Sequence, residues 1–146
     1  MKVKLFDETC LPTYSKKNDA GMDVFARKKT EWFLKDGFWR CNVPLGFALK
    51  CPSEYGIFLL SRSGMGRDES ISLVNSVGLG DRSFGNNEYA AMLTKIAVNI
   101  PKPEPISQYQ KIAQILLQET PKIYLEVVED FSIDGEVKKG FGSSGN

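Results

Sequence analysis

The hexapeptide SRSGMG, residues 61–66, brings together residue types that bind phosphate groups. The guanidinium of Arg62 presents a planar fork of N–H donors that suits phosphate oxygens, and the hydroxyl of Ser63 can donate one more hydrogen bond. Gly64 has no side chain, so backbone amides can approach an anion there. The same letters also fit a strand end followed by a turn, in which Arg62 is merely solvated.

A second segment, NSVGLGDRSFGNN at residues 75–87, reads as a strand that enters a glycine-rich hairpin with Asp81 at the bend. The amide of Asn75 can both donate and accept hydrogen bonds, as can backbone groups in an open hairpin. Reading the edge of a pyrimidine requires both kinds of group. Phe84 could stack on a sugar or a base. The alternative is that Asp81 is a turn residue and Phe84 belongs to the core.

Three further segments carry polar residues with a possible chemical role. Asp23 stands among apolar residues in DAGMDVFA, where a carboxylate needs a cationic partner or helps to hold the water shell of a metal. Lys111 and Gln114, in YQKIAQILLQ, are either solvated or donate to phosphate. The final KKGFGSSGN, residues 138–146, has small residues whose amides and hydroxyls can wrap an oxyanion, although it is not a GxxxxGK[ST] loop.

The chain contains no histidine. Ser-His-Asp and Cys-His mechanisms are therefore excluded within it, as are zinc sites with histidine ligands. If the protein is a hydrolase, we expect its general base to be a carboxylate.

The composition, with 146 residues of which 42% are hydrophobic and 25% charged, predicts a single soluble domain. The net charge of +1 disfavours a large interface with nucleic acid or with a membrane. No apolar run approaches the ~20 residues of a membrane span, and the first ten residues lack the apolar core of a secretion signal. The three cysteines are too few for a disulfide framework, so we expect reduced thiols and a cytoplasmic protein, in the host cytoplasm if it is viral.

Short runs rich in Val, Ile, Leu and Phe recur between Gly, Pro, Asn and Asp residues, as in an all-β protein. These runs cover residues 2–6, 22–26, 37–49, 55–61, 71–77, 89–100, 111–119 and 123–129. The alternation in KIAVNI, residues 95–100, is typical of a half-buried antiparallel strand. One or two helical turns are expected around residues 64–70, and the proline-rich residues 101–108 read as a surface connection. The pattern indicates a sandwich, a jelly roll or a distorted barrel.

In chain order, the five polar segments resemble the five motifs of the trimeric dUTPase family. AGMDVFA matches the first motif, SRSGMG the second, NSVGLGD with RSFG the third, KIAQILLQ the fourth and GFGSSG the fifth. The resemblance implies an all-β, jelly-roll-like distorted barrel that assembles as a homotrimer with active sites between subunits. It also implies a catalytic domain over residues 1–133 and a flexible C-terminal arm over residues 134–146 that closes on the site.

The activity that the resemblance implies is Mg²⁺-dependent hydrolysis of dUTP to dUMP and pyrophosphate. Asp81 matches the carboxylate that activates the attacking water, which agrees with the missing histidine. Asp23 is implied to act on the metal indirectly through water, or to pair with an interface arginine, while phosphates and water hold Mg²⁺ itself. The positions implied to contact the substrate are Arg62, Ser63, Gly64, Asn75, Gly78, Leu79, Phe84, Lys111, Gln114, Phe141, Gly142, Ser143 and Ser144.

The chain departs from the family pattern at several of these positions. Phe84 stands where a tyrosine is usual, and Gly80 stands where an isoleucine usually precedes the catalytic Asp. The segment after Phe84 suggests an insertion of one residue or a bulge. Lys111 replaces a common arginine, and the usual arginine of the fifth motif is missing, with Glu136 near its place. These departures concern affinity and rate more than the type of reaction.

Two other functions remain open at this point. A dCTP deaminase of the same fold would use a glutamate at the cytosine amine. A nucleotide-binding regulatory protein would keep the pocket and have weak turnover, and the departures in the third and fifth motifs favour it.

Overall fold

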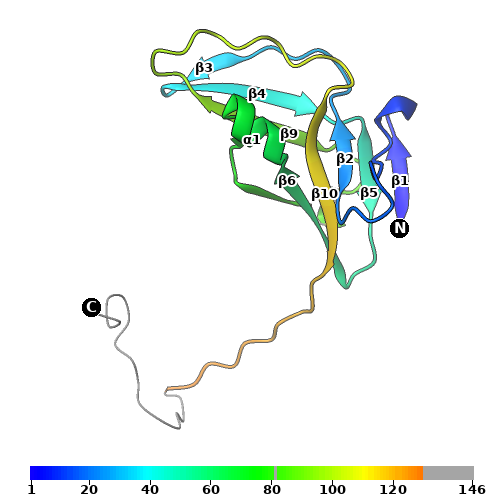
Figure 1. The fold of residues 1–146 in the computed structure, drawn as a ribbon. Coiled ribbons are helices and arrows are strands. Elements are labelled where there is room, and N and C mark those ends of the chain that lie inside the picture. Colours follow the sequence, from blue (N-terminus) through cyan, green and yellow to red (C-terminus); the bar gives the residue numbers. More distant parts are fainter. Residues whose placement is uncertain (81, 130–146) are drawn as a thin grey trace.

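The protein is described here by a computed structural model in which residues 1–80 and 82–129 are placed (Figure 1). Its regular secondary structure is almost all β-strand, as the sequence predicts. The strands are β1 (Lys2–Leu5), β2 (Met22–Phe25), β3 (Phe33–Lys35), β4 (Phe38–Pro44), β5 (Phe47–Lys50), β6 (Tyr55–Ser61), β7 (Ser72–Leu73), β8 (Val77–Gly80), β9 (Ala90–Ile96) and β10 (Lys111–Glu119). One α-helix, α1 (Ser63–Glu69), and two short 3-10 helices, η1 (Glu8–Cys10) and η2 (Arg82–Phe84), complete the described elements.

The strands form three antiparallel sheets that together make a distorted barrel. One four-stranded sheet has the order β2-β10-β6-β8, the second has the order β3-β4-β9-β7, and β1 pairs with β5. Strands that are neighbours in a sheet are often far apart in the sequence, since β10 lies between β2 and β6. This arrangement brings the first, second and fourth polar segments onto adjacent strands.

The core lies between the sheets and follows the two-residue alternation of the strands. In β4 the buried residues are Cys41 and Val43, and in β9 they are Ala91 and Leu93, while the residues between them face outward. Cys10, Cys41 and Cys51 are all buried free thiols, as expected. The expected helical turns around residues 64–70 are α1, which buries Met65.

Two sequence predictions of strands are wrong in part. The alternation in residues 95–100 does not continue a strand, because β9 ends at Ile96 and the chain turns so that the amide of Ile100 donates to Ala97 at 3.2 Å. Asn99 takes a left-handed conformation with φ 55°, which a strand does not allow. Local alternation therefore misplaced this boundary, and the short strand β3 was not predicted at all.

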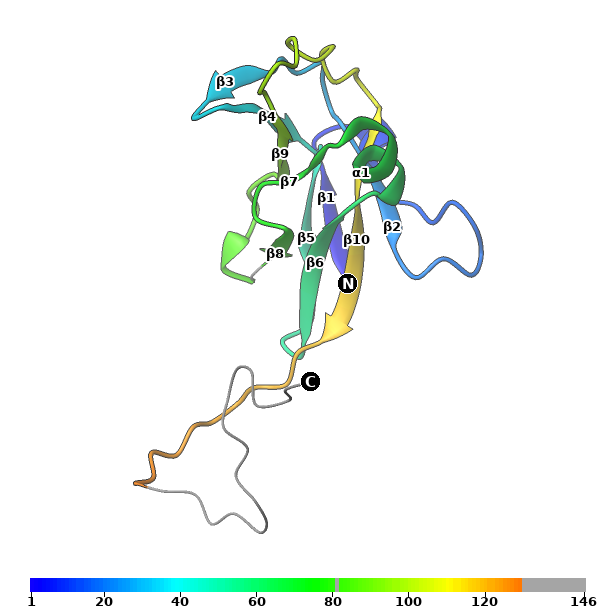
Figure 2. The same cartoon turned by 60° about the vertical axis from the view of Figure 1, so that its left-hand side comes forward.

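The run 123–129 is the other exception. It has the composition of a strand, yet it follows β10 as an extended segment that leaves the barrel (Figures 1 and 2). Tyr124, Leu125 and Val127 are each at least 90% exposed. No surface within the described part of this chain covers them, so a strand-like sequence has no sheet to join.

No helix in the described part of the chain is long and apolar enough to span a bilayer.

Candidate functional site

The first region of the candidate site is a cluster of charged side chains around Asp23. This carboxylate is only 3% exposed. Its Oδ2 lies 2.7 Å from Nζ of Lys111 and accepts a hydrogen bond from Oγ of Ser15 at 2.6 Å. Its Oδ1 accepts from Nε2 of Gln114 at 3.1 Å and lies 3.6 Å from Nε of Arg62. Four of the residues singled out in the sequence are thus in one place.

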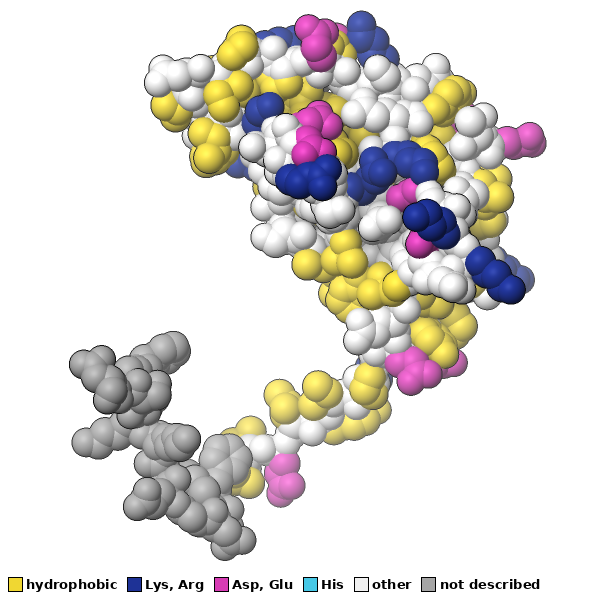
Figure 3. All heavy atoms as spheres, viewed as in Figure 1, with side chains coloured by type: hydrophobic (Ala, Val, Ile, Leu, Met, Phe, Trp, Pro, Cys, Tyr) yellow, Lys and Arg dark blue, Asp and Glu magenta, His cyan; other side chains and the backbone are white. Residues whose placement is uncertain are grey.

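The sheet explains why these residues meet. Asp23 on β2 is directly opposite Gln114 on the neighbouring β10, so their side chains lie on the same face. Lys111 begins β10, and Arg62 follows the end of β6, the other neighbour of β10. The guanidinium of Arg62 also donates to the carbonyl of Lys111 at 3.2 Å. On the face shown in Figure 3, Lys and Arg side chains surround acidic ones beside α1 and β10.

The electrostatics of the cluster keep Asp23 ionised. Burial raises the pKa of this carboxyl, but hydrogen bonds from Lys111, Ser15 and Gln114, with the charge of Lys111, outweigh it and lower the pKa. The carboxylate thereby holds two cations in fixed positions at a surface. Both cations remain partly exposed, with 32% of the Arg62 side chain and 41% of the Lys111 side chain accessible. They can therefore still meet an anion.

Ser63 and Gly64 lie next to this cluster, at the start of α1. The hydroxyl-bearing Ser63 is exposed. A Cβ added at Gly64 would meet no atom within 4 Å, so the surface around it is open. The second polar segment thus presents a cation, an exposed hydroxyl and an uncovered backbone together, which is the set of groups that phosphate requires.

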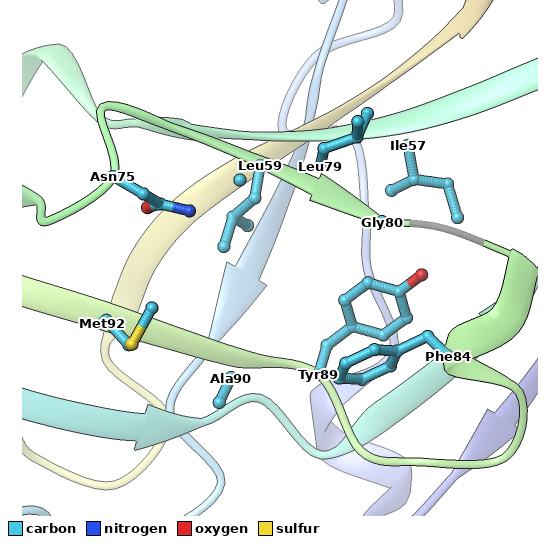
Figure 4. Close-up of a pocket in the computed structure, with 10 residues that line it drawn as sticks. Ile57, Leu59, Asn75, Leu79, Gly80, Phe84, Tyr89, Ala90 and Met92 are labelled. Atoms are coloured by element: carbon cyan, nitrogen blue, oxygen red, sulfur yellow. The ribbon is translucent and has the colours of Figure 1, made fainter.

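The second region is an apolar pocket of about 320 Å³ beside β8 (Figure 4). This volume is in the range of small-molecule sites. Four of the predicted substrate residues line it, and strands β6 and β9 supply most of the remaining wall. The lining residues are Ile57, Leu59, Asn75, Gly78, Leu79, Gly80, Phe84, Tyr89, Ala90 and Met92.

Strand β8 gives this pocket its polar edge. It is the edge strand of its sheet among the described residues, paired with β6 alone. Backbone groups along its other side are therefore available to a ligand, as the reading of a pyrimidine edge through the hairpin requires. Gly78 keeps the backbone close to β6, because a Cβ at this position would lie 3.0 Å from that of Leu59.

Aromatic side chains close one end of the pocket. Phe84 is 40% exposed and packs against Tyr89, with ring centroids 4.9 Å apart. Tyr89 in turn stacks on the buried Phe47 at 5.5 Å. Phe84 therefore presents a ring face at the surface, as a sugar-stacking residue must. The sequence pattern indicates Tyr89 only as the start of a strand and gives no sign of this packing role.

The outgoing limb of the hairpin is fixed by an ion pair that the sequence pattern does not indicate either. Glu88 accepts two hydrogen bonds from the guanidinium of Arg27, at 2.7 and 2.8 Å, and one from the amide of Gly46 at 2.7 Å. Burial raises the pKa of Glu88, but these bonds outweigh it and the pKa is lowered. Residues 27 and 88 are too far apart in the sequence for local spacing to reveal the pair.

The charged cluster and the apolar pocket lie far apart within one chain. Strands β2 and β8 are opposite edges of their sheet, which at about 4.8 Å per strand puts them roughly 14 Å apart. The side chains of Asp23 and Gln114 lie on one face. Leu59 and Gly78 lie on the other, because Leu59 is opposite the residue that follows Gln114. The cluster and the pocket wall formed by Leu59 and Gly78 therefore lie on opposite faces of this sheet.

The described residues do not form a metal site by themselves. No group of three or more acidic, Cys or His side chains is close enough to hold a metal ion within residues 1–80 and 82–129. Both oxygens of Asp23 are occupied by donors and cations. Asp23 is therefore not suited to direct coordination of a metal ion. The site suits an ion that is bound to phosphate oxygens and keeps its water ligands.

Asp81, Phe141, Gly142, Ser143, Ser144 and the whole arm 134–146, with the domain boundary at residue 133, lie outside the described residues.

Comparison with known proteins gives one consistent result. A sequence model of the dUTPase family matches residues 7–145. The deoxyuridine 5'-triphosphate nucleotidohydrolase of Orientia tsutsugamushi (strain Ikeda) is 32% identical over 152 residues, covering 99% of both chains. That of Polynucleobacter necessarius is 32% identical over 149 residues, covering 99% of this chain and 97% of its own.

Solved structures of dUTPases share the fold. The enzyme of Streptococcus mutans has a TM-score of 0.72 at 22% identity, over 85% of this chain and 99% of its own. A mutant dUTPase of Staphylococcus bacteriophage 80alpha with dUpNHpp has a TM-score of 0.77 at 21% identity, over 99% of this chain and 97% of its own.

Proposed function

This chain belongs to the dUTPase family, and we propose that it hydrolyses dUTP to dUMP and pyrophosphate. The observation that carries the proposal is the pocket beside β8. It combines apolar walls, a free backbone edge and an exposed aromatic ring. The chain continues from the end of β8 directly into Asp81, so the pocket and the proposed catalytic carboxylate are consecutive in the sequence.

In the proposed reaction, the carboxylate of Asp81 takes a proton from a water molecule while the oxygen of that water bonds to the α-phosphorus of dUTP. The bond from the α-phosphorus to the bridging oxygen breaks, and pyrophosphate leaves. Backbone groups of β8 bind the uracil edge, with Asn75 beside them, and Phe84 packs against the deoxyribose. A hydrogen-bonding site of this kind rejects bases whose donors and acceptors are mismatched.

The phosphates are proposed to bind at the Asp23 cluster. Arg62 and Lys111 supply positive charge, and Ser63 and Gln114 supply neutral donors. Asp23 fixes these groups in advance, so little reorganisation is needed when the anion binds. Mg²⁺, bound to the triphosphate and water, would neutralise part of its charge and orient it. We propose that Asp23 acts on this ion only through water.

We further propose that the active form is a homotrimer in which each site combines residues of different subunits. The pocket and the cluster of one chain lie on opposite faces of a sheet, so a nucleotide that uses both must use two chains. The exposed strand-like run 123–129 also requires a surface outside its own barrel. It leads to the glycine-rich arm 134–146, which would close over the nucleotide and supply Phe141, Gly142, Ser143 and Ser144.

The variant Asp81→Asn tests the proposed function. It should still bind a non-hydrolysable dUTP analogue, while pyrophosphate release from dUTP falls by about 10²–10⁴-fold, as expected for loss of a general base. Binding of the analogue by the wild type without any pyrophosphate release would instead support the regulatory protein. Release of ammonia from dCTP would support the deaminase.

A mixture of two inactive proteins tests the shared site. Arg62→Ala removes a phosphate contact and Asp81→Asn removes the base, so sites between subunits should regain activity when the two variants are unfolded and refolded together. If each site belonged to one chain, the mixture would stay as inactive as its components.

A further inference from the structure

The side chain of Tyr89 occupies the space into which a side chain at position 80 would extend. A Cβ added at Gly80 would lie 2.6 Å from Oη and 2.8 Å from Cε1 of Tyr89, and 3.1 Å from Cβ of Ile57. The first two distances are shorter than real Cβ contacts. Gly80 has no need of a left-handed backbone, since it is not among the residues with positive φ. Glycine is therefore required here by Tyr89 and not by the chain conformation.

Tyr89 is itself held rigidly. Its amide donates to the carbonyl of Phe47 at 2.9 Å, and its carbonyl accepts from the amide of Leu45 at 2.9 Å. The preceding residue, Glu88, is the one bound by Arg27. Tyr89 is only 7% exposed, and its ring stacks on that of Phe47 with an interplanar angle of 15°. The backbone and the ring are thus both fixed to the core.

The same ring also supports Phe84. Figure 4 shows the rings of Tyr89 and Phe84 side by side, with the hydroxyl end of Tyr89 directed toward Gly80. Phe84 packs on Tyr89 at an interplanar angle of 40° and is the outermost of three rings that begin at the buried Phe47. The position of Phe84 at the end of the pocket is therefore supported by Tyr89.

We propose that Tyr89 is a positioning residue that sets sugar specificity. Its ring packs against Phe84 and supports it, and its hydroxyl end occupies the space that a side chain at position 80 would otherwise fill. The inference rests on the proposed function, because it assumes that Phe84 meets the sugar of the substrate. In the proposed contact of Phe84 with the deoxyribose, a ring held in place by Tyr89 would exclude a 2′-hydroxyl group. Without the support of Tyr89, Phe84 can move away and a ribonucleotide can enter.

The test measures hydrolysis of dUTP and UTP by variants of both residues. In Tyr89→Leu the preference for dUTP over UTP in kcat/KM should fall at least about 10-fold. Tyr89→Phe keeps the ring and should retain this preference, whatever its rate. In Gly80→Ile the added side chain collides with Tyr89, and dUTP turnover should fall by about 10-fold or more.

The double variant Gly80→Ile/Tyr89→Leu separates the two roles. Isoleucine then occupies the space that the tyrosine ring has left, so dUTP turnover should recover about 10-fold over that of Gly80→Ile. The dUTP preference should stay low, because Phe84 still lacks its support. The proposal is overturned if Tyr89→Leu keeps the full preference for dUTP over UTP. It is also overturned if dUTP turnover by the double variant is no higher than the turnover expected from multiplying the losses of the two single variants.

Two readouts distinguish a failure of this inference from a failure of the proposed function. Binding of non-hydrolysable dUTP and UTP analogues reports the preference without turnover. Thermal unfolding of the wild type, Tyr89→Leu, Gly80→Ile and the double variant reports whether the changes at positions 80 and 89 compensate each other in stability. If the wild type releases no pyrophosphate but these readouts behave as stated, the proposed function is wrong and the role of Tyr89 stands. That role is disproved if the unfolding effects of the two single changes simply add in the double variant and if Tyr89→Leu has the same preference between the two analogues as the wild type.

Discussion

Replacing Asp23 by asparagine should destabilise the protein by an amount that its surroundings allow us to estimate. The change conserves shape but removes the negative charge that Lys111 and Arg62 contact at 2.7 and 3.6 Å. Breaking a fully buried ion pair costs about 3–5 kcal/mol. Here only the carboxylate is buried and solvent screens both cations, so we expect a loss of about 2–3 kcal/mol at pH 7. For a chain of this size that corresponds to a melting temperature lower by roughly 5–10 °C.

The loss should depend on pH in a defined direction. The pKa of Asp23 is lowered from its ordinary value of 3.8. The stability that this carboxylate contributes is therefore fully present above pH 3.8 and is lost as the pH falls through the lowered pKa. The difference between wild type and Asp23→Asn should be constant from pH 7 to about pH 5 and should shrink below pH 3.8.

Chemical denaturation at several pH values, at one fixed protein concentration, measures this difference. Asp68→Asn is a matched control, because Asp68 also contacts an arginine at 2.6 Å but its side chain is 56% exposed. The control should barely change stability at any pH. A difference for Asp23→Asn below 1 kcal/mol, or one that persists unchanged at pH 3, would refute the assigned charge network.

Three further changes test other parts of the structure. Gly46→Ala should cost about 3 kcal/mol or more in denaturation experiments, because Gly46 has φ 76° and an added Cβ would lie 2.5 Å from that of Cys10. The control Gly37→Ala has the same φ in open space and should cost about 1–2 kcal/mol. Equal losses would contradict the packing at Gly46. Glu88→Gln should lower stability by about 1–3 kcal/mol through loss of its charged pair, and a neutral result in the same assay would show that the hairpin is not held there. Deletion of residues 140–146 should leave the proposed trimer intact by sedimentation and abolish most dUTP turnover, and full activity would disprove a role for the arm.

The sequence predicted the all-β fold and the boundaries of β6 and β10 well, because both strands are apolar runs bounded by turn residues. The resemblance to the family named Asp23, Arg62, Lys111 and Gln114 as site residues, and these four side chains lie together in the structure. Spacing alone could not place Asp23 against Lys111, since their contact depends on the pairing of β2 with β10.

What the sequence did not reveal depends on contacts between distant residues. The pair of Arg27 with Glu88, and the fit of Gly80 to Tyr89, become visible only when the strands are assembled. The run 123–129 was predicted as a strand from its composition, and a strand needs an edge to pair with. In the described chain this edge is missing, so composition and structure disagree there for a physical reason.

The rate of pyrophosphate release from dUTP, dCTP, dTTP and UTP tests the central claim most directly. The account predicts rapid release from dUTP and rates lower by about 10²-fold or more for the other three, with no ammonia from dCTP. Release no faster from dUTP than from the other nucleotides, or no release at all, would contradict it.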